Sequence, residues 1–493
     1  MRRLANPPLG PANGARPADE TRPGAAIHRK SASLAHELLA LTAAAAAKRV
    51  AGNALVLAAL KGISPLISML LLMVICRRLG AEGMGRYALA YAYLNVFILL
   101  GSLGLPTLVT REAARHSHSL SALLASAMAL TGALSLALTA IMSALAVLSD
   151  FDGQTARAMV VLSLAIAPSI CLSCCEAAFL SREETLPIAL AALADNAFKA
   201  GLGIAAVLTG GGIDAVLGAA VAGRAAACGL SFVLLRRRGI LVTWTANVGS
   251  ARKLAAQTPV FALSSVCATL YWRADIFLLS RLRPLSEVGC YAAAYRILDM
   301  AIVPPQSLCQ ALYPGIARNS QATGTGRNPA LLGLALVTVP LAGAVTCLAP
   351  VLPRLLYGRA FWTATPTLMI LIWTTVPYAW NRYHANVLLA RDSQRADLLI
   401  NVTLLALNIA LNLVLIPRYG ANGAAAVTLA TAIFYGAAQS GYLKTTTRVA
   451  HRRGKSEREP PSAACDFGPR IGGGILRRRS PPKQFASGTE PAA

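Results

Sequence analysis

Long runs of apolar residues recur along almost the whole chain and leave few ways for it to fold. The hydrocarbon core of a bilayer is about 30 Å thick, and an α-helix needs about 20 apolar residues to cross it. Twelve segments meet that length, and no polar segment between them is long enough for a separate domain. We predict transmembrane helices over 54–76, 87–110, 120–148, 158–180, 186–208, 213–235, 257–280, 289–316, 329–353, 364–389, 396–416 and 421–443.

The composition agrees with lipid as the main solvent. Of the 493 residues, 55% are hydrophobic and 14% are charged, whereas soluble domains carry about 25% charged residues. The net charge is +25, but the basic residues flank apolar segments and concentrate near both ends of the chain. Nucleic-acid-binding proteins instead place a basic patch on a polar domain. We therefore expect membrane lipids, and not nucleic acid, as partners of the basic residues.

The basic residues outside the spans predict the orientation of the chain. With the N-terminus inside, 31 of them fall in cytoplasmic segments and 9 on the opposite face. Because Lys and Arg favour cytoplasmic segments, we predict a multi-pass protein of the inner (plasma) membrane with both termini in the cytoplasm. The N-terminal extension 1–50 is predicted to be disordered up to residue 33 and then to form a short surface helix. Residues 236–256 are predicted to form a basic cytoplasmic linker, and 444–493 a disordered basic tail.

An internal repeat divides the predicted spans into two halves. Gly85 opens the pattern G-x-Y-A-x-A-Y at the second span, and Gly289 opens it again at the eighth, 204 residues later. Chance similarity between Ala-rich helices is the alternative, but two looser matches keep the same order at similar offsets. The repeat predicts two six-helix lobes, 54–235 and 257–443. Because six is an even number of spans, both lobes should have the same orientation in the membrane, with a cleft between them. The looser matches pair Leu180-Ser181-Arg182 with Leu389-Ala390-Arg391, and Gly212 with Gly420.

Charged side chains inside the spans are the first candidates for a function. A charge at the bilayer centre costs about 2.5–3.5 kcal/mol, so each one needs a partner or a wet surrounding. Asp195 and Lys199 lie four residues apart and are predicted to form an ion pair on one helix face. Arg296 and Asp299, three residues apart, are predicted to pair in the same way. A purely structural ion network is the alternative to a binding role for Arg273, Asp275, Arg296 and Asp299.

Lys61, Arg224 and Arg382 have no acidic residue one helical turn away. Such cations are expected to face a wet cavity or an anionic ligand, and a diphosphate accepts charge-assisted hydrogen bonds from them. Snorkelling to the membrane surface is the alternative for Lys61 and Arg382, whereas Arg224 lies in the middle of its span. The predicted substrate-binding residues are thus Arg224, Lys61, Arg382, Arg273 and Arg296.

Other polar residues in the spans carry weaker predictions. Asn401, Asn408 and Asn412 share one helical face, which is typical of hydrogen bonding between membrane helices and leaves sugar contact as the alternative. Cys171 and its neighbours Cys174 and Cys175 form a cluster that predicts helix packing rather than a metal site, because no histidine lies near them in sequence. With no catalytic motif in the chain, we predict no metal, no cofactor and no enzymatic activity.

Several segments resemble one family of membrane proteins. Residues 79–87 are similar to the segment after its first helix, and Gly101 to Pro106 to its second helix. Residues 271–291 resemble its seventh and eighth helices, and residues 408–426 its last hairpin. The family is that of the O-antigen and exopolysaccharide flippases of the multidrug/oligosaccharidyl-lipid/polysaccharide exporter superfamily. The resemblance covers residues 54–443, and the long basic N-terminal extension departs from it.

The resemblance implies both an architecture and a cargo. Members of this family have two six-helix lobes that work by alternating access, so the resemblance implies the same architecture for this chain. It implies transfer of an undecaprenyl-pyrophosphate-linked oligosaccharide, an anionic lipid, from the cytoplasmic to the outer leaflet, with polysaccharide polymerase machinery as a candidate partner. A drug or cation antiporter of the same superfamily, a peptidoglycan-precursor flippase and a non-transporting membrane scaffold or enzyme remain as alternatives. The antiporter requires a buried carboxylate that binds and releases cations.

Overall fold

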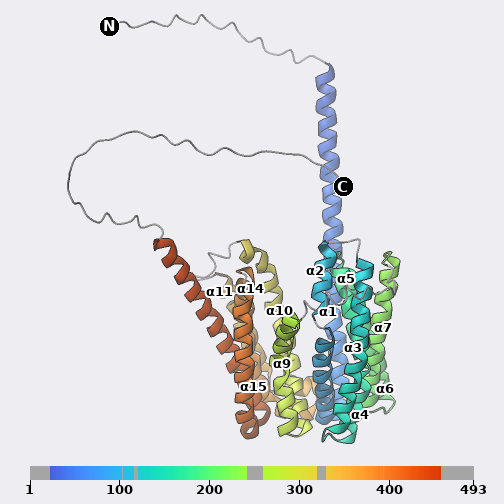
Figure 1. Cartoon of the computed structure of the whole chain (residues 1–493), viewed down its shortest axis with the longest axis vertical. Coiled ribbons are helices and arrows are strands. Elements are labelled where there is room, and N and C mark those ends of the chain that lie inside the picture. Colours follow the sequence, from blue (N-terminus) through green and yellow to red (C-terminus); the bar gives the residue numbers. More distant parts are fainter. Residues whose placement is uncertain are drawn as a thin grey trace, which may run out of the picture. The chain divides into compact units, whose positions relative to one another are not determined.

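A computed structural model describes residues 23–102, 104–115, 120–240, 259–318, 329–391 and 393–456. Helices account for nearly all of these residues, and no strand occurs among them, so the predicted all-α architecture is confirmed (Figure 1). The described residues up to Leu443 form one compact unit.

The N-terminal half contains the first six predicted spans. α1 (Pro23–Ser102) supplies two of these spans, here called its two arms, because the chain bends sharply at Gly80, where φ is 69°. Gly80 is required at this bend because a positive φ is disfavoured for residues with a side chain. The half is completed by α2 (Leu105–Arg115), α3 (Leu120–Leu148), α4 (Gly153–Ser163), α5 (Ile166–Leu180), α6 (Thr185–Leu208) and α7 (Ile213–Arg237).

The C-terminal half contains the other six. Its last element, α15 (Gln394–Ser456), bends at Gly420, where φ is 57°, so it too supplies two arms. A carboxylate oxygen of Glu287 accepts a hydrogen bond of 2.8 Å from the N–H of Ala421 and fixes this bend against a neighbouring helix. The preceding elements are α9 (Pro259–Leu282), α10 (Leu285–Arg318), α11 (Pro329–Leu348), α12 (Leu352–Tyr357), η2 (Arg359–Thr363), α13 (Ala364–Leu371), η3 (Ile372–Thr374) and α14 (Thr375–Ala390).

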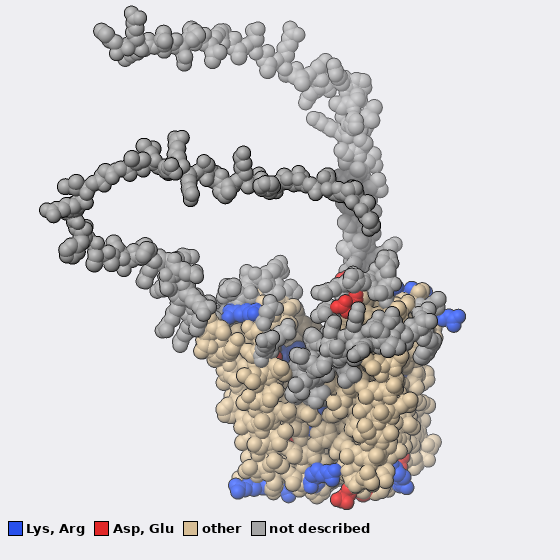
Figure 2. Space-filling view, viewed as in Figure 1, with Lys and Arg blue, Asp and Glu red and all other residues tan. Residues whose placement is uncertain are grey.

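Seven helical stretches among the described residues are long and apolar enough to cross a membrane. Two of them, Gly62–Ser102 and Ala396–Thr446, contain the bends at Gly80 and Gly420 and so provide two crossings each. α9, α10 and the α13–α14 segment complete the predicted twelve. Figure 2 shows a broad belt with few charged residues, Lys and Arg along its lower rim and a few more at the upper one, as expected for a protein embedded in a bilayer.

Three predicted spans are less regular than the sequence suggested. The span 87–110 is divided at Gly104, which has a φ of 70°. The span 158–180 is divided between α4 and α5, just before Pro168, and the span 364–389 contains η3 just before Pro377. Proline has no N–H to donate to the carbonyl four residues earlier, which explains why the helices tighten or break at the last two places.

Two predictions of disorder were wrong in part. α1 already begins at Pro23, inside the extension that we expected to be disordered up to residue 33. α15 continues to Ser456, inside the predicted disordered tail. Ala-rich sequence, as in 34–49, has a high helix propensity that continues a helix beyond the membrane. The remainder of both termini, 1–22 and 457–493, lies outside the described residues.

The two repeated patterns lie against each other where α1 meets α10. A Cβ atom on Gly85 would overlap with the carbonyl oxygen of Leu285, and a Cβ atom on Gly289 would overlap with that of Ala81. The two contacts are equivalent, because Leu285 lies four residues before Gly289 and Ala81 lies four residues before Gly85. The G-x-Y-A-x-A-Y segments thus occupy equivalent places in the two halves, as the duplication predicts, and their glycines allow the backbones to touch.

Further contacts join the halves near the same end. The Arg77 guanidinium donates hydrogen bonds to the carbonyl oxygens of Leu355 at 2.6 Å and Leu356 at 3.3 Å. The Tyr93 ring packs edge-on against Phe277 with 4.8 Å between ring centroids. The halves are therefore held together at the end where α1 and α15 bend.

We expect Gly85→Ala to destabilise the protein, because the new methyl group has to displace the backbone of α10. The cost should be about 1–3 kcal/mol, as for other overpacked contacts. Gly132→Ala is the matched control, since no heavy atom lies within 4 Å of a Cβ atom at Gly132 in α3. Thermal unfolding in detergent should show a lower midpoint for Gly85→Ala only. Equal midpoints for the two variants would contradict the close contact.

Candidate functional site

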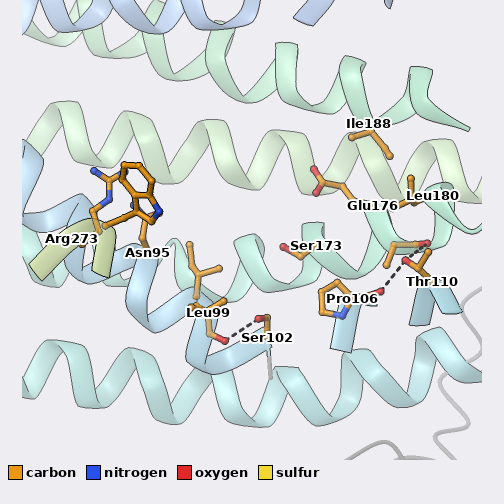
Figure 3. A pocket seen from close by; sticks show the side chains of 13 residues that line it. Asn95, Leu99, Ser102, Pro106, Thr110, Ser173, Glu176, Leu180, Ile188 and Arg273 are labelled. Carbon is orange, nitrogen blue, oxygen red and sulfur yellow. Dashed lines mark hydrogen bonds between the residues drawn. The ribbon is translucent and has the colours of Figure 1, made fainter. Parts of the chain in front are cut away.

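A wide cavity, here called cavity A, opens among α1, α2, α5, α6 and α9, with a volume of about 1070 Å³. Arg273 and Asn95 lie at one end, and Glu176 lies toward the other (Figure 3). Leu180 ends α5, so the Glu176 end of the cavity is the end of the bundle away from Gly80. Cavity A is lined by Asn95, Ile98, Leu99, Ser102, Pro106, Thr110, Ser173, Glu176, Ala177, Leu180, Ile188, Trp272 and Arg273.

A narrower cavity, cavity B, lies within the C-terminal half and has a volume of about 270 Å³. Its wall is rich in amides and aromatic hydroxyls, which donate and accept hydrogen bonds, and it also includes a cation and two carboxylates. Cavity B is lined by Tyr271, Trp272, Asp275, Tyr295, Thr374, Tyr378, Asn381, Arg382, Ala385, Asp397, Asn401, Asn408, Thr428, Ala432 and Tyr435.

A third and smaller space, cavity C, lies between the two halves with a volume of about 30 Å³. It shares Asn95 and Arg273 with cavity A and Tyr295 with cavity B. Trp272 lines both of the larger cavities. The three spaces therefore adjoin one another around Trp272 and Arg273, which α9 places between the halves.

The structure brings Arg273 and Arg296 to this junction, as the sequence suggested. Both line cavity C together with Asp299. Arg296 and Asp299 form the predicted ion pair, with 3.6 Å between nitrogen and oxygen. The Arg273 guanidinium carbon lies 5.9 Å from the centre of the Tyr295 ring, within the range of a cation–π interaction. Among the described residues no carboxylate lies within ion-pair distance of Arg273, so its charge is open to a ligand.

Asp275 does not join the predicted network of side chains with Arg273. Its side chain is buried, accepts a hydrogen bond from the Tyr291 hydroxyl and another of 2.8 Å from the N–H of Ile276. The Tyr291 hydroxyl lies 3.3 Å from the hydroxyl of Thr428. Asp275 therefore fixes α9 against α10 and α15.

Arg382, predicted from the sequence to face a wet cavity or an anionic ligand, lines cavity B. No carboxylate among the described residues lies within ion-pair distance of it. Asp397 lines the same cavity, but its carboxylate accepts hydrogen bonds of 3.1 Å from Tyr435 and Gln439 and 3.2 Å from Asn401. Three hydrogen-bond donors thus bind the Asp397 carboxylate, which does not pair with Arg382.

The interpretation of Arg224 as a cation without a partner was wrong. Its guanidinium lies 3.3 Å from a carboxylate oxygen of Asp195, and neither residue lines cavities A to C. The pair forms because Gly223 lets α7 approach α6 closely: a Cβ atom there would lie 2.7 Å from the carbonyl oxygen of Asp195. Sequence spacing along one helix does not reveal a pair across two helices.

The predicted pair of Asp195 with Lys199 is replaced by a different arrangement. The Lys199 ammonium is buried and donates a hydrogen bond of 2.7 Å to the Asn196 side-chain oxygen. Asn196 donates one of 2.6 Å to Ser64 on α1. Asp195 and Lys199 thus belong to the packing of α1, α6 and α7. The side chain of Lys61 lies outside the described residues.

The asparagine stripe joins the two arms of α15. Asn412 donates to Asn408 at 2.9 Å, and Asn408 donates to Thr431 on the other arm at 3.4 Å. This favours the interhelical role, although Asn401 and Asn408 also line cavity B.

The sequence reasoning missed the aromatic wall between the cavities. The Trp272 ring packs edge-on against Tyr271 and Tyr378, with 5.8 Å between centroids in each pair. The adjacent Tyr271, Trp272 and Arg273 were a usable signal, since aromatic side chains with polar tips rarely flank a charge in the middle of a span. Glu176, which lines cavity A, was not among the predicted site residues either.

Comparison with known proteins agrees with this geometry. The sequence profile described as "polysaccharide biosynthesis protein" matches residues 50–320. No curated protein matches the sequence. Among solved structures, the lipid II flippase MurJ in an inward closed conformation superposes with a TM-score of 0.68 at 13% identity, covering 79% of this chain and 87% of that one. An inward-facing multidrug resistance MATE family transporter of the MOP superfamily gives 0.62 at 14% identity, covering 79% and 96%.

A third neighbour is a MOP superfamily transporter from Pyrococcus furiosus, with a TM-score of 0.56 at 13% identity over 80% of this chain and 93% of that one. The chain thus has the fold of these transporters. Because the family profile matches more than half of its length, the chain belongs to the polysaccharide biosynthesis protein family.

The Asp195–Arg224 pair predicts a specific pattern of stability. Arg224→Ala should leave a buried carboxylate without a partner and cost about 3–5 kcal/mol. The double variant Arg224→Ala with Asp195→Asn should recover most of that loss, because no buried charge is then left uncompensated. The yield and thermal midpoint of the purified protein measure both. A stable Arg224→Ala single variant with impaired transport would instead support the original assignment of Arg224 to a ligand.

Proposed function

We propose that the protein is a flippase that moves an undecaprenyl-pyrophosphate-linked oligosaccharide from the cytoplasmic to the outer leaflet of the inner membrane. The observation that carries the proposal is the position of Arg273, which lies without an acidic partner among the described residues where the three cavities adjoin. A diphosphate bridging Arg273 and Arg382 would receive charge-assisted hydrogen bonds from both. Membership of the polysaccharide biosynthesis family supports a glycan as the rest of the cargo.

The cavity walls suit an oligosaccharide. The amides and hydroxyls of cavity B match the hydrogen-bonding groups of sugars, and the rings of Trp272, Tyr271 and Tyr378 offer apolar faces on which sugar rings pack. Cavity A has the larger volume, about 1070 Å³, and offers room for several sugars. We assign the diphosphate to Arg273, Arg296 and Arg382, and leave Lys61 as a prediction from sequence.

The contact between α1 and α10 supports alternating access as the mechanism. It closes the end of the bundle at Gly80, while cavity A extends toward the opposite end. With both termini in the cytoplasm, as the basic residues predict, the closed end is the outer one and the cavity opens inward. Separation of Gly85 from Gly289 would then expose the site to the outer leaflet.

Glu176 favours a second candidate, an antiporter of drugs or cations. It lines cavity A, and among the described residues no basic side chain lies within ion-pair distance of it. A carboxylate in such a place can take up and release a cation. The cations at the junction favour the anionic cargo, and Glu176→Gln separates the two functions. If the protein is an antiporter, this variant should lose cation-coupled drug transport. If it is a flippase, the variant should still bind the lipid diphosphate.

Arg273→Gln should reduce flipping of a fluorescent undecaprenyl-pyrophosphate oligosaccharide in proteoliposomes by roughly 10- to 100-fold, the effect of losing one hydrogen bond to a charged group. Arg273→Lys should retain part of the activity, because the charge remains while the planar fork is lost. The exposed Arg418, in the turn of α15, provides the control variant Arg418→Gln with full activity. Unchanged flipping by Arg273→Gln, normalised to inserted protein, would contradict the proposal.

A further inference from the structure

An apolar groove lies on the surface of the C-terminal half between α14 and the second arm of α15, with a volume of about 500 Å³. Trp373 and Trp380 form one wall, and Ile433 forms the other. These three large side chains are 39%, 45% and 55% exposed. Gly436 and Ala437 leave the space between the walls unfilled. The groove lies on the surface of two predicted membrane spans, 364–389 and 421–443.

Asn381 connects this groove with the polar interior. It lines both the groove and cavity B, and it is only 6% exposed. Its amide nitrogen donates a hydrogen bond of 2.8 Å to the carbonyl of Ala432. Its side-chain oxygen is buried and has no partner among the described residues. That oxygen points to Gly436, where a Cβ atom would lie 2.7 Å from it. One side chain thus separates the polar cavity from the apolar groove.

We propose that the groove holds the polyisoprenoid tail of the cargo lipid while its diphosphate and sugars occupy the joined cavities. The inference rests on the proposed function and adds the path of the tail. Cavity B is lined by amides and charges, so the apolar tail of a lipid whose diphosphate binds there is better placed against an apolar surface nearby. Asn381 lines both spaces, so the groove lies directly beside cavity B.

Photocrosslinking at neighbouring positions tests the occupant directly. Ala437 lines the groove, whereas Ala438, equally exposed on the same helix, does not. A benzoylphenylalanine at each position is irradiated in phosphatidylglycerol nanodiscs that contain undecaprenyl pyrophosphate. Mass spectrometry should find undecaprenyl adducts at 437 in several-fold excess over 438. Phospholipid adducts alone, or equal undecaprenyl yields at both positions, would overturn the inference and assign the groove to bulk lipid.

A second measurement separates this inference from the proposed function. Ala437→Trp fills the groove and should weaken binding of undecaprenyl pyrophosphate about tenfold, which corresponds to the lost burial of roughly two methylene groups. Ala437→Trp should bind inorganic pyrophosphate as the wild type does. The control variant Ala438→Trp should bind undecaprenyl pyrophosphate as the wild type does. If Arg273→Gln weakens lipid binding and Ala437→Trp does not, the groove assignment alone fails. If the wild-type protein does not bind undecaprenyl pyrophosphate, the proposed function fails with it.

Discussion

The close approach of α1 and α10 is the contact on which the rest of this structure depends. Gly85 and Gly289 let the two backbones touch, because neither residue has a side chain there. Because lipid tails are as apolar as the helices, burial of apolar surface gives little drive for association in a membrane, and close packing has to supply it. A contact made of small residues in both halves is also one that can open without leaving charges unpaired.

The arrangement of charges follows from that contact. It brings α9 and α10 to the boundary between the halves, where Arg273, Arg296 and Asp299 line one small space. Two buried carboxylates have protein partners: Asp195 pairs with Arg224, and Asp275 accepts a hydrogen bond from Tyr291. Among the described residues, Arg273 at the boundary and Arg382 in cavity B have no carboxylate within ion-pair distance.

Much of the fold could be predicted from the sequence, because lipid requires long helices and every span is visible as an apolar run. The repeat identified Gly85 and Gly289 as matching positions, but it did not predict that they touch. The site was predicted less well. Spacing along one helix found the Arg296–Asp299 pair but not the pair between Asp195 and Arg224, which depends on Gly223 packing α7 against α6. The groove beside Asn381 depends on helix packing for which the sequence has no periodic signal.

The central claim is that the two halves must separate at the α1–α10 contact for a lipid-linked oligosaccharide to cross. Tyr93 and Phe277 face each other across this boundary, with ring centroids 4.8 Å apart. The most direct measurement is flipping by a Tyr93→Cys, Phe277→Cys variant in a background without native cysteines, before and after a short thiol crosslinker joins the pair. We predict that crosslinking stops flipping and that reduction restores it. Flipping at the unlinked rate in fully crosslinked protein would contradict the account.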